Sequence, residues 1–200
     1  MLPKRFELRA PAFSAAANLE APALVSAIAA DYASAGAAMI TTNTTCAHRH
    51  YVGDDVARQC RAAVALARRG APSAQVAGAV AMLPAAVEPI RRAQQYRETA
   101  IALVESGIDV LLLESFVDLD ELARALEVRP CADHIWLFVS ADQWLALDDA
   151  QRWDLELRVR ALSAGLLIVS PSACALQSVA PLNPQRQDGA VGRMLLLDCV

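Results

Sequence analysis

The chain has 200 residues, of which 56% are hydrophobic and 20% are charged. This length is enough for one domain with a sizeable core, and this composition excludes a disordered protein. The formal net charge of -4 argues against a nucleic-acid-binding protein, because contacts to phosphates need clustered positive charge. We therefore expect one globular domain that occupies residues 1–200.

Short apolar segments recur along the chain at intervals of about 25 to 40 residues, the length of one strand–helix unit. They are apolar on both faces, as parallel strands covered by helices are. Counted generously, Arg5–Arg9 adds one more strand. The predicted strands are Ala37–Thr45, Gln75–Met82, Ile108–Phe116, Ile135–Ser140, Gly165–Ser170 and Met194–Cys199.

Amphipathic segments fill the gaps between these strands, and their ends carry helix signals. The pairs Arg68–Arg69 and Arg91–Arg92 are interpreted as charges on helix surfaces rather than as an anion site. The alternation of strands and helices predicts a parallel α/β fold. The predicted helices follow the apolar stripe from Leu24 to Tyr32, the segment from Asp54 to Gly70, the segment from about Pro89 to Gly107, a short stretch after Asp118, and the segment from Asp148 to Ser163.

Polar side chains follow two of the predicted strands where each strand ends. Thr42 and Asn43 close the first strand, and Glu114 closes the third. In parallel α/β proteins, ligands bind at the carboxyl ends of the strands. The Glu114 carboxylate is costly to bury without a partner, which could be a ligand, a nearby backbone N–H or an arginine. The Asn43 amide could orient a ligand or connect neighbouring loops.

The cysteines and the apolar segments indicate where the protein works. No window of about 18 uncharged apolar residues occurs and no signal peptide is recognised, so we expect no membrane segment. The cysteines are odd in number and widely spaced, without a C-x-x-C pair, which is typical of free thiols in a reducing cytoplasm. They are Cys46, Cys60, Cys131, Cys174 and Cys199.

Three blocks of sequence resemble the motifs of one enzyme family, in the same order and at similar spacing. Residues 31–45, DYASAGAAMITTNTT, are similar to Y-x-x-A-G-A-x-x-I-x-T-N-T. Residues 64–68 and 76–80, VALAR and VAGAV, are similar to A-V-x-L-A-R and V-A-G-S-V. Residues 102–115, ALVESGIDVLLLES, are similar to L-x-x-A-G-V-D-L-L-x-x-E-T. On these blocks the chain resembles the homocysteine S-methyltransferase family, including its betaine-dependent members.

This resemblance implies a (β/α)8 barrel that transfers a methyl group to the sulfur of homocysteine. It also implies a zinc ion held by three cysteines, which lowers the thiol pKa so that homocysteine binds as the nucleophilic thiolate. Glu114 matches the family glutamate that binds the amino group of the substrate, and Thr42 and Asn43 match the family T-N-T segment.

The chain departs from the family pattern at both ends. Residues 1–10 contain no glycine, so the family's first-strand motif D-G-G-M-G-T is missing. The family motif G-x-N-C aligns with residues 167–170, which places Ser170 where the first zinc cysteine belongs. The second cysteine motif, G-G-C-C-G, is absent, and only Cys174 and Cys199 could supply thiolates. We therefore expect no zinc cofactor, with these two cysteines as weak candidates.

A second metal site is conceivable after the first predicted strand. Cys46, His48 and His50 would point to the same side of an extended segment. The commoner interpretation of such residues is a solvated loop. His134, which precedes a strand, is expected to be exposed.

A shortened or incomplete barrel would expose strand edges and apolar surface, so we expect a homo-oligomer or an obligate protein partner. The favoured function is a divergent homocysteine S-methyltransferase-like protein that binds a small amino-acid-type ligand without the family zinc–thiolate site. The alternatives are a non-catalytic scaffold or subunit, an enzyme that has reused the pocket for other chemistry, and a working thiol S-methyltransferase whose zinc ligands are shared between subunits.

Overall fold

The computed structural model of the chain describes residues 13–116, 118–127, 132, 134–161, 165–170 and 195–198. Strands and helices alternate along it, as the sequence predicts. The strands are β1 (Met39–Thr41), β2 (Gln75–Ala81), β3 (Val110–Glu114), β4 (Ile135–Ser140), β5 (Gly165–Ser170) and β6 (Leu195–Asp198). The helices are α1 (Phe13–Glu20), α2 (Pro22–Ser34), α3 (Arg49–Val52), the 3-10 turn η1 (Gly53–Asp55), α4 (Val56–Gly70), α5 (Pro89–Glu105), α6 (Leu119–Leu126), α7 (Ala141–Ala146) and α8 (Asp149–Ala161).

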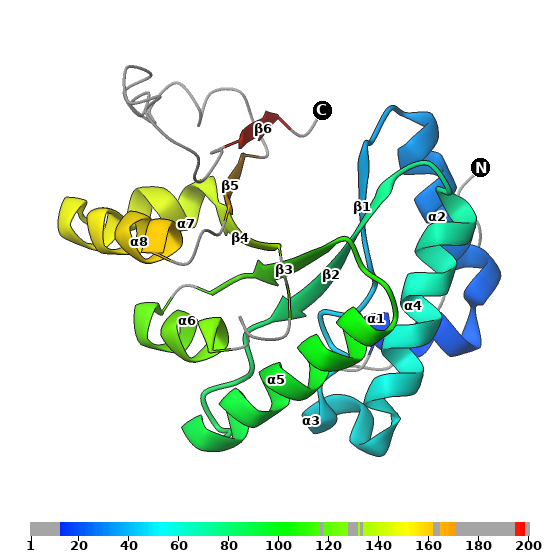
Figure 1. Ribbon diagram of the computed structural model, residues 1–200, viewed down its shortest axis with the longest axis horizontal. Helices are drawn as coiled ribbons and strands as arrows, with labels where there is room; N and C mark the ends of the chain where they lie inside the picture. Colours follow the sequence, from blue (N-terminus) through cyan, green and yellow to red (C-terminus); the bar gives the residue numbers. More distant parts are fainter. Residues whose placement is uncertain are drawn as a thin grey trace.

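The strands form one parallel sheet in the order in which they occur in the chain. The sheet is curved, and α4, α5, α6 and α8 lie around its outside (Figure 1). Within the described residues β1 and β6 each have one neighbouring strand, so the sheet is open between them. This order and curvature confirm the predicted parallel α/β fold. The expected oligomer or protein partner stays a prediction.

The predicted strands are confirmed, and the first is the one whose length differs most. The sequence predicts Ala37–Thr45, whereas β1 covers Met39–Thr41 only. Beyond Thr41 the backbone turns, because the Thr44 N–H bonds to the Thr42 carbonyl instead of continuing the ladder. The extra strand expected at Arg5–Arg9 lies outside the described residues.

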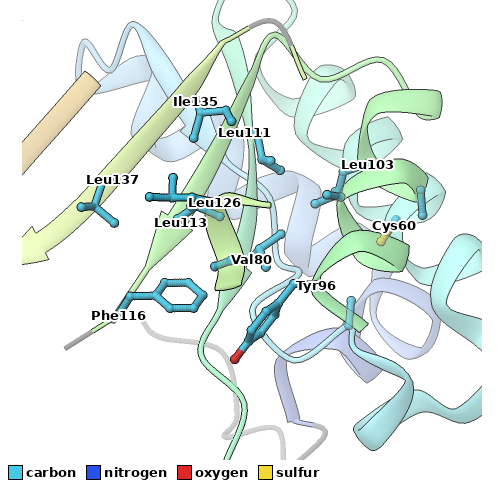
Figure 2. Packing of buried hydrophobic residues seen from close by; sticks show 14 of the residues in the cluster. Cys60, Val80, Tyr96, Leu103, Leu111, Leu113, Phe116, Leu126, Ile135 and Leu137 are labelled. Carbon is cyan, nitrogen blue, oxygen red and sulfur yellow. The ribbon is translucent and has the colours of Figure 1, made fainter. Parts of the chain in front are cut away.

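The two faces of the sheet have different cores. On the convex face, alternate strand residues such as Leu111 and Leu113 pack against helix residues such as Tyr96 and Leu103 (Figure 2). On the concave face a smaller cluster occurs, formed by the residues of the opposite parity. It contains Ala77, Val110 and Leu112, with Met39, Trp136 and Phe138 packed against it.

Helix α2 packs differently from the expectation. An amphipathic helix usually turns its apolar stripe toward the core, yet in α2 Leu24 is 36%, Ile28 47% and Tyr32 62% exposed. The helix instead packs against α4 at close range, through small residues. A Cβ atom on Gly70 of α4 would lie 2.2 Å from the backbone carbonyl oxygen of Ser26. This close approach selects glycine at position 70 and turns the large apolar residues of α2 outward.

The short helix predicted after Asp118 is confirmed as α6. The Asp118 carboxylate accepts hydrogen bonds from the N–H groups of Asp120 and Glu121 and so caps α6, as its position after a strand predicts. No helix in the described part of the chain combines the length and the apolar composition that crossing a bilayer requires.

Candidate functional site

The polar residues singled out in the sequence gather at the carboxyl edge of the sheet. Glu114 ends β3 and lies in register with Ala81 of β2 and Phe138 of β4. The segment after β1 reaches the same edge, because the Thr44 hydroxyl donates to the Ala79 carbonyl at 2.7 Å. Thr42 and Asn43, which follow β1, and Glu114, which ends β3, therefore lie at the same edge of the sheet, on either side of β2.

Thr42 fixes this edge through its hydroxyl group, which is buried. The hydroxyl accepts a hydrogen bond from the Ala79 N–H at 3.1 Å and lies 2.7 Å from the Thr44 hydroxyl. The one proton of Thr44 is directed to the Ala79 carbonyl, so Thr42 must be the donor between the two threonines. Both hydroxyls thus connect the end of β1 to β2, which is a structural task.

Asn43 is half-buried, and its backbone carbonyl is bound by a residue of helix α1. The side-chain amide of Asn18 on α1 donates to the Asn43 carbonyl oxygen at 2.8 Å. Asn18 is 2% exposed, and its Oδ1 has no hydrogen-bond partner among the described residues. No sequence pattern marks Asn18, because a polar residue in a short alanine-rich helix resembles any surface position.

Glu114 is a half-buried carboxylate without a protein partner in the described part of the chain. No hydrogen bond or ion pair from a described residue reaches it. It follows Leu112 on the concave face, and this burial raises its pKa. The next residue, Ser115, has a φ of 61° and is the one non-glycine residue with positive φ among those described. Backbone strain of this kind is concentrated at functional sites.

The position of His48 contradicts both the conceivable cluster with Cys46 and His50 and the solvated loop favoured over it. The chain is helical from Arg49 to Val52, so these three positions do not lie on one side of an extended segment. His48 is fully buried rather than solvated. Its Nε2–H donates to the Ala81 carbonyl at 2.8 Å, so Nδ1 accepts from the hydroxyl of Thr99 at 3.0 Å. Burial lowers the pKa of His48 to about 4, which keeps the ring neutral.

Of two other side chains predicted to be exposed, the structure confirms His134 and corrects Arg92. His134 is exposed, as expected. Arg92 was interpreted as a helix-surface charge, but its side chain is 13% exposed and binds Glu121 at 3.0 Å. Glu121 itself is 1% exposed and receives a second arginine, Arg124, at 3.5 Å. The hydroxyl of Tyr96 donates to the other carboxylate oxygen at 2.7 Å.

This Tyr96–Glu121–Arg92–Arg124 network, which we call the Glu121 network, lies between α5 and α6. Tyr96 also accepts a hydrogen bond from the Leu83 N–H at 2.9 Å, in the loop that follows β2. The ring of Phe116, two residues after Glu114, packs edge-on against Tyr96 with 5.4 Å between centroids. The network therefore supports the two loops on either side of Glu114.

The comparisons with known proteins now decide the family. A family model described as homocysteine S-methyltransferase matches residues 1–155, more than half of the chain. The chain belongs to the homocysteine S-methyltransferase family. A comparison with curated proteins found no match.

The solved structures include a homocysteine S-methyltransferase relative with the same fold. The homocysteine methyltransferase MmuM from Escherichia coli, in its apo form, aligns with 93% of this chain and 84% of its own, at 19% identity and a TM-score of 0.60. At this identity the likeness shows the fold alone. That structure is a barrel-type α/β methyltransferase, and the open parallel sheet described here is consistent with a shortened barrel of the same type.

The zinc set that the family resemblance implies can be compared with the residues present. β5 ends at Ser170, the position at which the motif comparison predicts the first zinc cysteine, and its register partner on β6 is Asp198. The other candidates, Cys174 and Cys199, lie outside the described residues. Within the described ranges no three His, Cys, Asp or Glu side chains are placed to hold a metal ion. The described residues therefore do not fit a set of three thiolates.

Proposed function

We propose that this member of the homocysteine S-methyltransferase family binds a small amino-acid-type ligand at the carboxyl ends of β1, β2 and β3. The Glu114 carboxylate holds the ammonium group of the ligand. The observation that carries this proposal is that Glu114 has apolar neighbours on its face and no partner among the described residues. An ionised carboxylate in such surroundings is costly unless a cation meets it, and a ligand ammonium would be that cation.

The ligand site divides its tasks among the three residues of the carboxyl edge. Thr42 holds the edge together, as its hydrogen bonds to Ala79 and Thr44 indicate. Asn43 follows Thr42 at the same carboxyl edge of the sheet, where its side-chain amide can orient the polar end of a ligand. Glu114 supplies the negative charge. This arrangement binds and orients a ligand but contains no group that activates a thiol.

We propose further that the family zinc–thiolate site is not retained. Support comes from Ser170 at the end of β5, with which the first zinc cysteine of the family aligns in the motif comparison. Without a thiolate-generating metal, ordinary methyl transfer to homocysteine has no activating agent. The function is then ligand binding, as a pseudoenzyme or as an enzyme with altered chemistry.

Calorimetric titration with L-homocysteine and L-methionine under reducing conditions tests the ligand proposal. We expect the wild type to bind, and Glu114→Gln to weaken binding about 10- to 150-fold, because a charge-assisted hydrogen bond is lost. Glu105→Gln is the matched control, since Glu105 is an exposed glutamate at the carboxyl end of α5. Absence of binding by the wild type, or equal binding by Glu114→Gln, would refute the proposal.

Elemental analysis of the same preparations tests the proposal about zinc. We expect substoichiometric zinc in protein purified under reducing conditions. About one zinc per chain that is lost in Cys199→Ser would contradict us, and would support the alternative in which subunits share the zinc ligands. An oligomer with no zinc and no bound amino acid would instead support a non-catalytic scaffold.

A further inference from the structure

The wall beside Glu114 contains an aromatic ring. Phe138 of β4 is the direct register partner of Glu114, and both residues lie on the concave face of the sheet. Phe138 is half-buried, packed at the edge of the concave cluster rather than enclosed in it. On the other side of Glu114 the register partner is Ala81, whose side chain is a single methyl group. Of the two register partners of Glu114, only Phe138 is therefore large.

The register fixes how near the ring lies to the carboxylate. Neighbouring parallel strands are about 4.7–4.9 Å apart, and paired residues on the same face project side by side. A cation that contacts the Glu114 carboxylate on the side facing β4 can therefore come within about 6 Å of the Phe138 ring. That is the range in which an aromatic face attracts a cation.

We propose that Phe138 is a specificity-determining residue of this site, which attracts the ligand ammonium by a cation–π contact while Glu114 pairs with it. This inference rests on the proposed function and names a residue that the ligand site needs for its selectivity. The ring and the carboxylate together favour a ligand that carries an organic cation over the same ligand without it. An aliphatic side chain at position 138 would exclude water from Glu114 equally well but would not attract a cation.

The substitution Phe138→Leu separates these two contributions, because it keeps an apolar neighbour and removes the aromatic face. Two ligands are titrated, L-methionine and its desamino analogue, which lacks the ammonium group. We expect Phe138→Leu to weaken L-methionine about 2- to 30-fold and to leave the desamino analogue within about twofold. Phe138→Tyr, which restores the aromatic face, is expected to bind L-methionine within about threefold of the wild type.

Phe116→Leu is the matched control, since Phe116 lies on the helix side of the sheet against Tyr96 (Figure 2). We expect it to lower stability without changing the ratio of the two affinities. If Phe138→Leu weakens both ligands equally, or neither, the inference is wrong while binding through Glu114 still stands. If the wild type binds no L-methionine, or Glu114→Gln binds it equally well, the proposed function fails and this inference fails with it.

Discussion

The buried hydroxyl of Tyr96 supports the loops around Glu114, and removing it is the sharpest test of that support. Tyr96 is fully buried, and its hydroxyl has two partners. It accepts from the Leu83 N–H at 2.9 Å and donates to the Glu121 carboxylate at 2.7 Å. Leu83 is also fully buried, so its N–H cannot turn to water when the hydroxyl is gone.

The magnitude follows from these two partners. Tyr96→Phe leaves the ring in place and strands one backbone N–H, which costs about 1–3 kcal/mol. It also removes a hydrogen bond to a charged group, for which about 1.5–3 kcal/mol is typical. The two losses share one hydroxyl and do not add fully, so we expect the free energy of unfolding to fall by about 2–4 kcal/mol. That is a large part of the free energy of unfolding of a typical domain, which is about 5–15 kcal/mol.

Urea denaturation at 25 °C measures this loss, with Tyr32→Phe as the control. Tyr32 is 62% exposed, so the same deletion there should change the free energy of unfolding by less than about 0.5 kcal/mol. The slope of the transition should stay unchanged in both variants. A Tyr96→Phe protein as stable as Tyr32→Phe would refute the reasoning, because it would mean that the Leu83 N–H and Glu121 do not depend on the hydroxyl.

Three further predictions concern His48, Glu114 and Gly70. Because the pKa of His48 falls from 6.5 to about 4 on folding, the unfolded chain binds the proton first, and up to about 3 kcal/mol of stability should be lost between pH 6.5 and 4; His48→Gln should flatten this part of a urea-midpoint profile, whereas the exposed His50→Gln should not. Because burial raises the pKa of Glu114 above 4.5, its ionised form costs stability, so ligand-free Glu114→Gln should gain stability over the wild type as the pH rises from 4.5 toward 7, and a constant difference would contradict this. Gly70→Ala should destabilise by about 1–3 kcal/mol or more in thermal unfolding, because its Cβ would meet the Ser26 carbonyl oxygen at 2.2 Å, and a neutral result would mean that α2 and α4 can move apart freely.

The strands could be predicted from the sequence because each is a short, largely apolar run, and helices separate the first five of them. β4 and β5 match the predicted Ile135–Ser140 and Gly165–Ser170 at both ends. Their pattern is local, since a parallel strand buried on both faces is apolar whatever its neighbours are. The position of Glu114 follows from the same pattern, because it is the first charged residue after an apolar run.

The buried polar contacts could not be predicted, because their partners are distant in the sequence. His48 is satisfied by Thr99, 51 positions away, and Tyr96 by Glu121, 25 positions away. Each of these residues, taken alone, resembles a surface residue, and its burial depends on a partner that only the fold brings near. The outward orientation of the apolar stripe of α2 could not be predicted for a related reason. The helix packs against α4 at Gly70, and a hydrophobicity pattern does not show where two backbones approach closely.

The contrast between two glutamates supports a ligand at Glu114. Glu121 lies deeper, at 1% exposure, yet the chain supplies it with Arg92, Arg124 and the Tyr96 hydroxyl. Glu114 lies seven positions earlier, at the edge of the sheet, with Leu112 and Phe138 on its face and no described cation. A carboxylate with a purely structural task is expected to be paired as Glu121 is, because an unpaired one only costs stability. The charge of Glu114, which no described residue compensates, is the one that the proposed ligand ammonium would neutralise.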